Sequence, residues 1–315
     1  MKNYFKILVA SDYSKAGVNA EHYAIQLAKE TNSILTFFHV FEEPYYFREQ
    51  VNEFEILNEN PVKQEAEDLK QHIADIYVSM GMNPQKEEYH CIVRQGLMAN
   101  ELYMEAESSN VDFIIAGTHE ADFLQSVIEG SHTWELIKNS EVPVLAIPEN
   151  ARYENIKNIV FATEYRKGEI PVINFLTNIA RQLDAELTIL HVYNDVFSKE
   201  FERDIFERFK REVKAFIEYD RLSIVLVHNN DLVKGLNSFC TYVNANWLIM
   251  SHEKTMFFVS MFNPPSVTKK MSLHTHVPLL AVPDGYQPQH ETAKRLDGNG
   301  HISNADLYKD FFADA

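Results

Sequence analysis

Short apolar runs alternate with amphipathic helical stripes along the chain. The first run, Lys6–Ala10, ends at polar residues and is followed by apolar positions spaced for one face of a helix. Further runs lie at residues 34–40, 113–116 and 142–147, and the run at 113–116 stops at Gly117. Runs this short have the length of strands. Strands that alternate with helices predict a parallel, doubly wound α/β sheet.

Three stripes of apolar residues have helical spacing and are predicted to face the core. Stripes of this kind, aromatic residues included, are far more often core than a cofactor-binding box. The acidic, aromatic stretch from Glu42 to Pro61 is interpreted as a loop, with a lid or a docking surface as the alternative. The predicted core positions are Ala20, Tyr23, Ala24, Leu27 and Ala28; Val62, Ala66, Leu69, Ile73, Ile76, Tyr77 and Met80; and Phe201, Ile205, Phe209, Val213 and Phe216.

The order of elements occurs twice. Residues 6–13 align with 158–165 and residues 35–40 with 187–192, both at a shift of 152, and residues 142–148 align with 277–283 at a shift of 135. Each copy also has a His-Glu pair after its fourth strand, at 119–120 and at 252–253. A repeat of this length predicts two homologous domains, at residues 1–150 and 151–284, followed by a tail at 285–315.

A candidate ligand site follows the strand that ends near Gly117. A 13-residue span leads from it to Gly130-Ser131 and then to an amphipathic helix. Free backbone N–H groups and the helix dipole converge where a strand hands over to a helix, and this arrangement holds anions in α/β sheets. Ser131 is expected to be the N-cap of that helix, with a hydroxyl available to the backbone or to a ligand.

The spacing of Gly117, Gly130 and Ser131 resembles the G-x2-G-x9-G-[S/T] nucleotide loop of the universal stress proteins. The strand that ends in Ser11-Asp12 and the closing segment at 142–148 are also similar to that family. The resemblance implies flavodoxin-like (adenine nucleotide alpha hydrolase-like) domains with five parallel strands in the order 3-2-1-4-5. It also implies that the last strands of the two domains pair as an intramolecular pseudo-dimer, and two chains could pair again as a homodimer.

The same resemblance supplies the candidate nucleotide site of the first domain. An aspartate in the place of Asp12 contacts the nucleoside in this family, and the backbone in the place of Val40 reads the base. A second interpretation of Asp12 has equal weight, namely that it caps the helix that begins near Ser14. The candidate residues for ATP or AMP are Asp12, Val40, Gly117, Thr118, Gly130 and Ser131.

Glu120 stands where the family has the second glycine of the loop. If that position needs a left-handed backbone, a side chain costs roughly 1–2 kcal/mol. A carboxylate about 4 Å from a phosphate adds repulsion on the order of 4 kcal/mol at an effective dielectric near 20. Together these two costs approach the free energy of micromolar binding, which is about 8 kcal/mol. A bound cation or an outward-turned Glu120 would restore nucleotide binding.

The second copy departs further from the motif. Met250-Ser251-His252-Glu253 contains no glycine, and Pro265-Ser266 replaces Gly130-Ser131, so that a donor N–H is lost. Glu164 stands in the place of Asp12. We therefore predict that the second domain binds no nucleotide and is retained for structure or for pairing.

Composition narrows the class of protein. The chain has 315 residues and a net charge of -17, which argues against a nucleic-acid surface because phosphate contacts need clustered Lys and Arg. It has no membrane-length apolar run and no signal-peptide layout at its start, so a cytoplasmic location without membrane association is expected. Cys91 and Cys240 are expected to be buried and reduced.

The remaining polar residues do not form a recognisable catalytic set. His39 and His191, matched in the two copies, are expected to be structural, and His274 and His276 lack a third ligand for a metal. The tail resembles part of an EF-hand or dockerin loop, but Arg295 stands where its first carboxylate belongs, so a Gly/Asn turn is predicted and Ca2+ is not expected. The ligands of that loop would be Asp297, Asn299, His301, Ser303 and Asp306.

The sequence therefore predicts a non-enzymatic stress-response adaptor or sensor with an unidentified protein partner. One alternative is an ATP- or AMP-binding switch with slow ATP hydrolysis in the first domain. Another is a binder of a non-nucleotide small molecule in the same crevice. Glu120 separates these interpretations, because the adaptor needs it to block the loop and the switch needs it to bind a metal or turn away.

Overall fold

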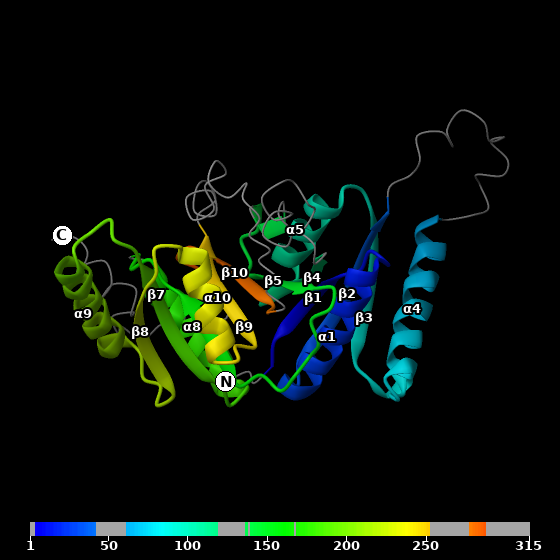
Figure 1. Cartoon of the computed structure of the whole chain (residues 1–315). Coiled ribbons are helices and arrows are strands. Elements are labelled where there is room, and N and C mark those ends of the chain that lie inside the picture. The colour runs from blue at the N-terminus through cyan, green and yellow to red at the C-terminus, as the bar shows by residue number, and fades with distance from the viewer. Residues whose placement is uncertain are drawn as a thin grey trace, which may run out of the picture.

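A computed structural model describes residues 4–41, 61–118, 136–137, 139–166, 168–252 and 277–287. These residues form one ten-stranded sheet with the strand order β3-β2-β1-β4-β5-β10-β9-β6-β7-β8 (Figure 1). The first half of the sheet contains β1 (Lys6–Ala10), α1 (Lys15–Thr31), β2 (Ile34–Phe41), α4 (Pro61–Ser79), the short 3-10 helix η1 (Pro84–Lys86), β3 (Tyr89–Gln95), α5 (Met98–Ser108), β4 (Phe113–Thr118) and β5 (Val144–Pro148).

The second half repeats this order of elements. Renumbered from its own first strand, each half has the strand order 3-2-1-4-5 with parallel neighbours, so the predicted fold class is confirmed. The division into domains at residues 1–150 and 151–284 stays a prediction. The elements are β6 (Asn158–Ala162), α8 (Glu169–Gln182), β7 (Glu186–Tyr193), α9 (Lys199–Phe216), β8 (Leu222–His228), α10 (Leu232–Tyr242), β9 (Trp247–His252) and β10 (Leu279–Pro283).

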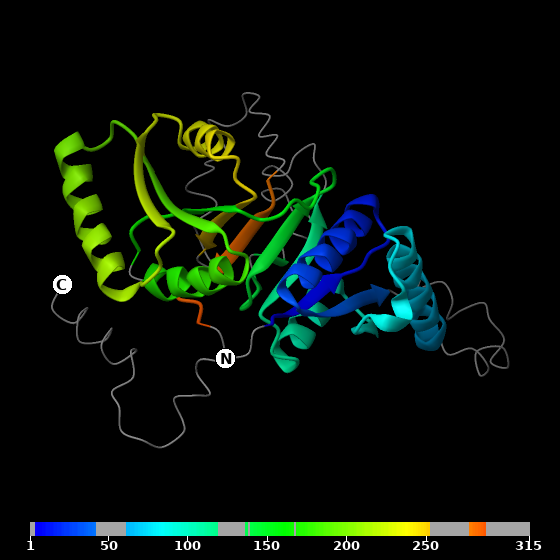
Figure 2. The ribbon, with the colours of Figure 1, turned by 90° about the horizontal axis from the view of Figure 1, so that it is seen from below.

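The two halves join through their last strands. β5 and β10 pair antiparallel, with Ala146 opposite Leu279 and Val144 opposite Ala281. Every other neighbouring pair in the sheet is parallel. The expected pairing of the last strands is therefore present within one chain, and seen from below it makes a continuous sheet from end to end (Figure 2).

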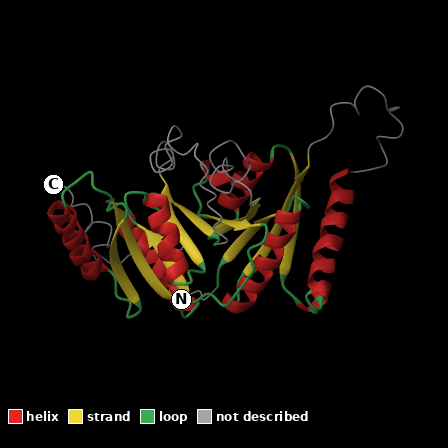
Figure 3. Cartoon of the chain, viewed as in Figure 1, coloured by secondary structure: helices red, strands yellow, loops and turns green. Residues whose placement is uncertain are grey.

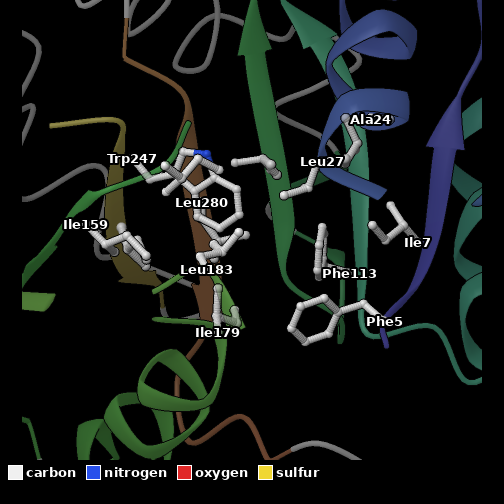
Figure 4. Close-up of a cluster of buried hydrophobic side chains, with 14 of the residues drawn as sticks. Phe5, Ile7, Ala24, Leu27, Phe113, Ile159, Ile179, Leu183, Trp247 and Leu280 are labelled. Carbon is white, nitrogen blue, oxygen red and sulfur yellow. The ribbon is translucent and has the colours of Figure 1, made fainter. Parts of the chain in front are cut away.

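Helices cover both faces of the sheet (Figure 3). Residues of α1, α4, α8 and α9 pack on one face in a single hydrophobic cluster that runs through both halves. Residues of α5 and α10, with Leu136 and Ile137, pack on the other face. In the first cluster, Phe113 and Leu27 lie on one side of the β5–β10 join and Trp247 and Ile159 on the other (Figure 4). The core is therefore shared by the two halves.

Local sequence explains the ends of α1, the helix nearest the candidate site. The Ser14 hydroxyl caps it by accepting the Gly17 N–H at 3.0 Å. At the other end Asn32 has the left-handed conformation, with φ of 51°, and its N–H bonds to the Ala28 carbonyl. Asparagine tolerates that conformation better than most residues, so the helix stops there.

Several predictions from the pattern need correction. The fourth strand does not stop at Gly117, because β4 continues to Thr118 and Gly117 lies opposite Ile147 of β5. The α9 stripe buries Phe206, Phe209 and Val213, and Phe201 is 49% exposed because it lies in the first turn, ahead of the core. Cys240 is buried as expected, but Cys91 is only half-buried because it lies on the end strand β3.

Other predictions fall outside the described residues. They concern the stretch from Glu42 to Asn60, the nucleotide-loop residues Glu120, Gly130 and Ser131, and the pair Pro265-Ser266. His274, His276 and the whole calcium-loop candidate, with Asp297, Asn299, His301, Ser303 and Asp306, lie there as well.

Candidate functional site

The described candidate residues gather at the carboxyl ends of neighbouring strands. Asp12 follows β1, Val40 is the penultimate residue of β2, and Gly117 and Thr118 end β4. Asp12 and Gly117 line one small cavity of about 40 Å³, together with Ala10, Met98, Ala99, Leu102, Ala116 and Leu136. The sheet therefore brings the predicted residues to one edge, which is where open α/β folds bind ligands.

Asp12 takes part in the turn that starts α1. Its Oδ1 accepts the Ser14 N–H at 2.9 Å, and Ser14 in turn caps the helix. A Cβ added at Gly17 would lie only 2.1 Å from the same Oδ1. The carboxylate of Asp12 thus occupies the space beside the helix N-terminus that a side chain at residue 17 would take. This contact favours the helix-turn interpretation, and Asp12 also stays exposed at the cavity.

Gly117 is a glycine for a structural reason. A Cβ there would lie 2.3 Å from the backbone carbon and oxygen of Ala16 and 2.6 Å from the Gly17 nitrogen. Neither is a flexible group that could move aside. The first turn of α1 therefore packs directly against the end of β4, and this packing needs glycine whether or not a phosphate is bound.

Thr118 and Val40 are held by the sheet. Thr118 is buried, and its carbonyl accepts the Glu149 N–H at 2.9 Å. Val40 is 8% exposed and lies opposite Arg94 of β3. Neither side chain lines the small cavity beside Asp12, so any contribution of these two residues to a ligand would come from their backbone.

A tyrosine and a histidine meet at the same place in both halves. The Nδ1–H of His39 donates to the Ser11 carbonyl at 2.7 Å, and that of His191 donates to the Thr163 carbonyl at 2.7 Å. The two histidines are therefore structural, as predicted, because each ties the end of the second strand of its half to the end of the first. Tyr13 packs on His39, with ring centroids 4.6 Å apart, and Tyr165 packs on His191 at 4.0 Å.

Burial shifts the pKa of His191 and that of Tyr13. Burial lowers the pKa of His191, although Nε2 lies 3.8 Å from a Glu202 carboxylate oxygen. Burial, with the nearby carboxylates of Glu65 and Asp68, raises the pKa of Tyr13 to about 12. A neutral phenol and a histidine that donates to the backbone are poorly suited to exchanging protons with a substrate.

The sheet register corrects the alignment of the two copies around the fourth strand. β1 aligns Ile115 with Val9, and β6 aligns Ile249 with Phe161, which places Ser251 where the first half has Gly117. The pairings with β5 and β10 give the same result. His252 therefore corresponds to Thr118, and the two His-Glu pairs of the sequence are not equivalent positions.

In the second half, a buried carboxylate lies at the start of α8. Glu169 stands where the first half has Gly17, and it is 1% exposed. Its carboxylate accepts the Glu164 N–H at 3.0 Å and a hydrogen bond from the Thr163 hydroxyl. Glu164, the counterpart of Asp12, turns away to pair with Arg166. Glu169 thus holds the turn at the start of α8, as Asp12 and Ser14 hold the turn at the start of α1.

Burial disfavours the charged form of Glu169, and two hydrogen bonds favour it. Burial raises the pKa of this carboxyl to about 7, although the hydrogen bonds from Thr163 and Glu164 favour the charged form. The helix also begins later here: α8 starts at Glu169 after Gly168, without a side-chain cap, whereas α1 starts at the position equivalent to 167. Sequence reasoning missed this exchange, although the shift of 152 already aligns Gly17 with Glu169.

No group of three or more His, Cys, Asp or Glu side chains is placed to hold a metal ion among the described residues. In the same part of the chain, no helix is long and apolar enough to cross a membrane.

Comparison with known proteins finds a family and a relative that the first half of the chain resembles. Residues 3–148 match the model of the universal stress protein family. A universal stress protein of Methanocaldococcus jannaschii is 26% identical over 145 residues, which cover 46% of this chain and 82% of that protein. The fold of this chain consists of flavodoxin-like α/β units, and the candidate site lies at the carboxyl ends of the strands. Residues 3–148, slightly less than half of the chain, are therefore similar to the universal stress protein family.

Solved structures extend the likeness in fold to both halves. The crystal structure of a universal stress protein from Archaeoglobus fulgidus gives a TM-score of 0.61 at 16% identity, and the match covers 89% of this chain and 97% of that one. A putative universal stress protein from Pseudomonas aeruginosa gives a TM-score of 0.52 at 15% identity, over 92% and 97% of the two chains. At these identities the comparison concerns the fold alone.

Proposed function

We propose that this chain is a non-enzymatic adaptor or sensor of the stress response with at most one nucleotide-type site, in its first half. The site would consist of Asp12, the backbone of Val40, Gly117 and Thr118, and the loop end at Gly130-Ser131. A protein partner would read the state of this half, and a cytoplasmic location belongs to the same proposal. The second half would serve as the structural counterpart of the first.

The exchange of Gly17 for Glu169 is the observation that carries this proposal. In the second half the carboxylate is 1% exposed and bound by Thr163 and by the backbone of Glu164, so that a ligand would have to displace it. Displacement would also bring a ligand phosphate next to a carboxylate, which is repulsive. This arrangement favours one site for each chain and agrees with the loss of glycine at Ser251.

The side chains at the first crevice support a role without turnover. The Asp12 carboxylate and the His39 imidazole both bond to backbone groups, at Ser14 and at Ser11. General acid or base catalysis needs such a group within reach of a reacting proton instead. We infer that these residues shape the crevice, and that Glu120 in the loop limits binding of a phosphate chain.

One observation favours a second candidate function, a nucleotide-binding switch with slow ATP hydrolysis. Asp12 remains exposed and lines the cavity beside Gly117, at the sheet edge where ligands of this fold class bind. This candidate requires that Glu120 coordinate a cation or turn outward. A non-nucleotide small molecule in the same crevice is a variant of this idea in which the loop contacts no phosphate.

Thermal unfolding in the presence of ATP or AMP, with and without Mg2+, separates these functions. The measurement is made on the wild type, on Glu120→Gly and on the control Glu253→Gly, which replaces the glutamate that follows β9 at the position aligned with His119. A ligand that binds only the folded state raises stability by RT ln(1 + [L]/Kd). The adaptor proposal expects a response from Glu120→Gly alone.

The other outcomes are equally informative. A response of the wild type that depends on Mg2+ would favour the switch and contradict a blocked loop. A response gained by Glu253→Gly would contradict the closed second crevice. If neither nucleotide stabilises any of the three proteins, the nucleotide site is rejected and the adaptor function has to rest on protein contacts alone.

A further inference from the structure

A buried ion pair joins α1 to α4 in the first half. Glu21 of α1 is completely buried, and one of its carboxylate oxygens lies 2.8 Å from Nε2 of His72 on α4, the neighbouring helix (Figure 1). Its other oxygen, Oε1, is also buried and has no hydrogen-bond partner among the described residues. A buried carboxylate is costly unless a positive charge compensates it, and His72 is the partner that supplies this charge.

The second half makes the equivalent contact without charge. Ile173 corresponds to Glu21 by the shift of 152, and it is completely buried. Phe209 corresponds to His72, because its ring packs on the tyrosine of the second half as His72 packs on Tyr13. Apolar residues of similar volume often stabilise a fold as well as a buried ion pair does, or better. The packing of these helices therefore does not require the charges of the first half.

Tyr13 connects the ion pair to the candidate site. Its ring contacts two histidines, with centroid distances of 4.9 Å to His72 and 4.6 Å to His39. Its backbone has φ of 59°, a left-handed conformation that bulky residues rarely adopt. On either side of it, Asp12 and Ser14 form the turn in which Asp12 Oδ1 accepts the Ser14 N–H. The two ring contacts therefore hold a strained residue in the middle of the Asp12 turn.

We propose that protonated His72 holds the Asp12 turn in place and that loss of its proton releases the turn, so that the first crevice responds to pH. The protonated ring compensates the charge of Glu21 and keeps α4 against α1. Without the proton, the carboxylate is buried beside a neutral ring, and α4 moves away from α1 so that water reaches Glu21. Tyr13 then loses one of its two ring contacts, and its strained backbone relaxes.

Release of the turn affects the site of the proposed function, because Asp12 lines the cavity beside Gly117. Regulation of a nucleotide-type ligand by pH therefore rests on that function, whereas the movement of the turn does not. The movement is measured without any ligand, so a crevice that binds no nucleotide leaves its test intact.

The turn is held at acid pH and released at alkaline pH. The hydrogen bond to Glu21 raises the pKa of His72 above its ordinary value of 6.5, so the turn is held below pH 6.5 and released as the pH rises through the higher value. Tyr13 and Cys91 lie near the same contact but titrate far above neutral pH, because burial raises their pKa values to about 12 and about 11. The other charged or titratable groups around it are His22 of α1, His39 of β2, and Glu65, Asp68, Lys70 and Asp75 of α4.

Hydrogen exchange, measured by NMR on the whole chain without ligand, tests the movement. The Gly17 N–H donates to the Ser14 hydroxyl at 3.0 Å and reports on the turn, and the Leu27 N–H in the interior of α1 reports on the helix. Protection factors correct for the intrinsic pH dependence of exchange. From about pH 5.5 to about pH 8.5, we expect the protection factor of Gly17 to fall about tenfold or more and that of Leu27 to stay within about twofold.

The matched variant Glu21→Ile/His72→Phe gives the first half the residues of the second. It keeps the other histidines of the contact and Glu169, so any pH dependence of those groups stays the same. The fall at Gly17 should disappear in this variant. If the double change disturbs folding, Glu21→Gln is decisive, since it keeps a hydrogen-bonding side chain, removes the buried charge and should also abolish the fall.

A protection factor of Gly17 that does not depend on pH in the wild type would overturn the proposal. A fall that persists in either variant would also overturn it, because the fall would then come from His39 or another group. An equal fall at Leu27 would have the same consequence, since it would report unfolding of the whole helix. Absence of nucleotide binding contradicts only the proposed function, since no ligand is present in this experiment.

Discussion

The indole Nε1–H of Trp247 donates a hydrogen bond of 2.7 Å to the Tyr23 hydroxyl, across 224 residues of sequence. Trp247 begins β9 in the second half and is 1% exposed, and Tyr23 lies in α1 of the first half and is 3% exposed. Tyr23 also packs edge-on against Tyr153, with ring centroids 4.9 Å apart, in the segment that connects the halves. The two halves are thus locked together by side chains as well as by the join of β5 and β10.

Replacing Trp247 by Phe should destabilise the whole chain. The change removes the buried donor and leaves a cavity, and we expect a loss of about 2 to 4 kcal/mol in the free energy of unfolding. Urea unfolding followed by circular dichroism gives this value. In a double-mutant cycle with Tyr23→Phe, the coupling energy should be about 0.5 to 1.5 kcal/mol. Strict additivity would mean that the hydrogen bond does not contribute to the contact between the halves.

Gly117→Ala should be among the most damaging substitutions of a small residue. The added methyl group would meet the backbone of Ala16 at 2.3 Å, so α1 or β4 must move, and a cost of about 3 kcal/mol or more is expected. The matched control is Ser251→Ala at the equivalent place of β9. Ser251 has a buried hydroxyl for which the structure shows no partner, so its removal should change stability by less than about 1 kcal/mol. Equal costs would contradict the close packing of α1 on β4.

Glu169 predicts a loss of stability as the pH rises. Its pKa is about 7 in the folded chain and close to 4.5 when unfolded, so the folded state holds the proton more tightly. The stabilising effect of that proton is complete below pH 4.5 and is lost as the pH rises to about 7. Relative to Glu169→Gln, the wild type should lose about 1 to 3 kcal/mol between pH 5 and pH 8, as measured by urea unfolding. A parallel pH dependence of the two proteins would refute the assignment.

The contact between α1 and α4 adds a second pH-dependent element. His72 Nε2 lies 2.8 Å from a carboxylate oxygen of Glu21, which is completely buried. The hydrogen bond to Glu21 raises the pKa of His72 in spite of desolvation. Its contribution is therefore complete below pH 6.5 and disappears as the pH rises through the higher pKa of the folded state.

An NMR titration of the His72 ring should show this raised pKa directly. His72→Gln should remove about 1 kcal/mol of stability at pH 6 and less at pH 8. His90→Gln, at an exposed position of β3, is the control and should have no such effect. A pKa of His72 at or below its ordinary value would contradict a stabilising hydrogen bond between His72 and Glu21.

The pattern of apolar runs predicted the strands and the repeat, because the period and length of a run reflect how its residues are buried. The pairing of the last strands was predicted from the family resemblance. The pattern could not predict that β4 runs through Gly117. Glycine in a loop and glycine under a packed helix look the same in one sequence, and only the contact with Ala16 distinguishes them. Phe201 kept the helical spacing but lies in the first turn of α9, ahead of the core that begins near Phe206.

The candidate site, like the fold, was predicted only in part from the sequence. Asp12, Val40, Gly117 and Thr118 were predicted at one sheet edge and lie there. The role of Glu169 escaped the sequence because it depends on two substitutions acting together, a glutamate at residue 169 and the turning of Glu164 toward Arg166. Each residue alone reads as an ordinary surface carboxylate, and only the alignment of Gly17 with Glu169 connects them.

The pairing of β5 with β10 has to wait until the ribosome has synthesised β10. Ala146 pairs with Leu279, so the ribosome must add roughly 130 residues after β5 before its partner strand exists. At about 5 to 20 residues per second, the apolar edge of β5 waits for some 7 to 27 seconds. During that interval, two nascent chains on one messenger RNA could exchange their edges. The speed at which the second half emerges therefore determines whether the sheet closes within one polypeptide or between two.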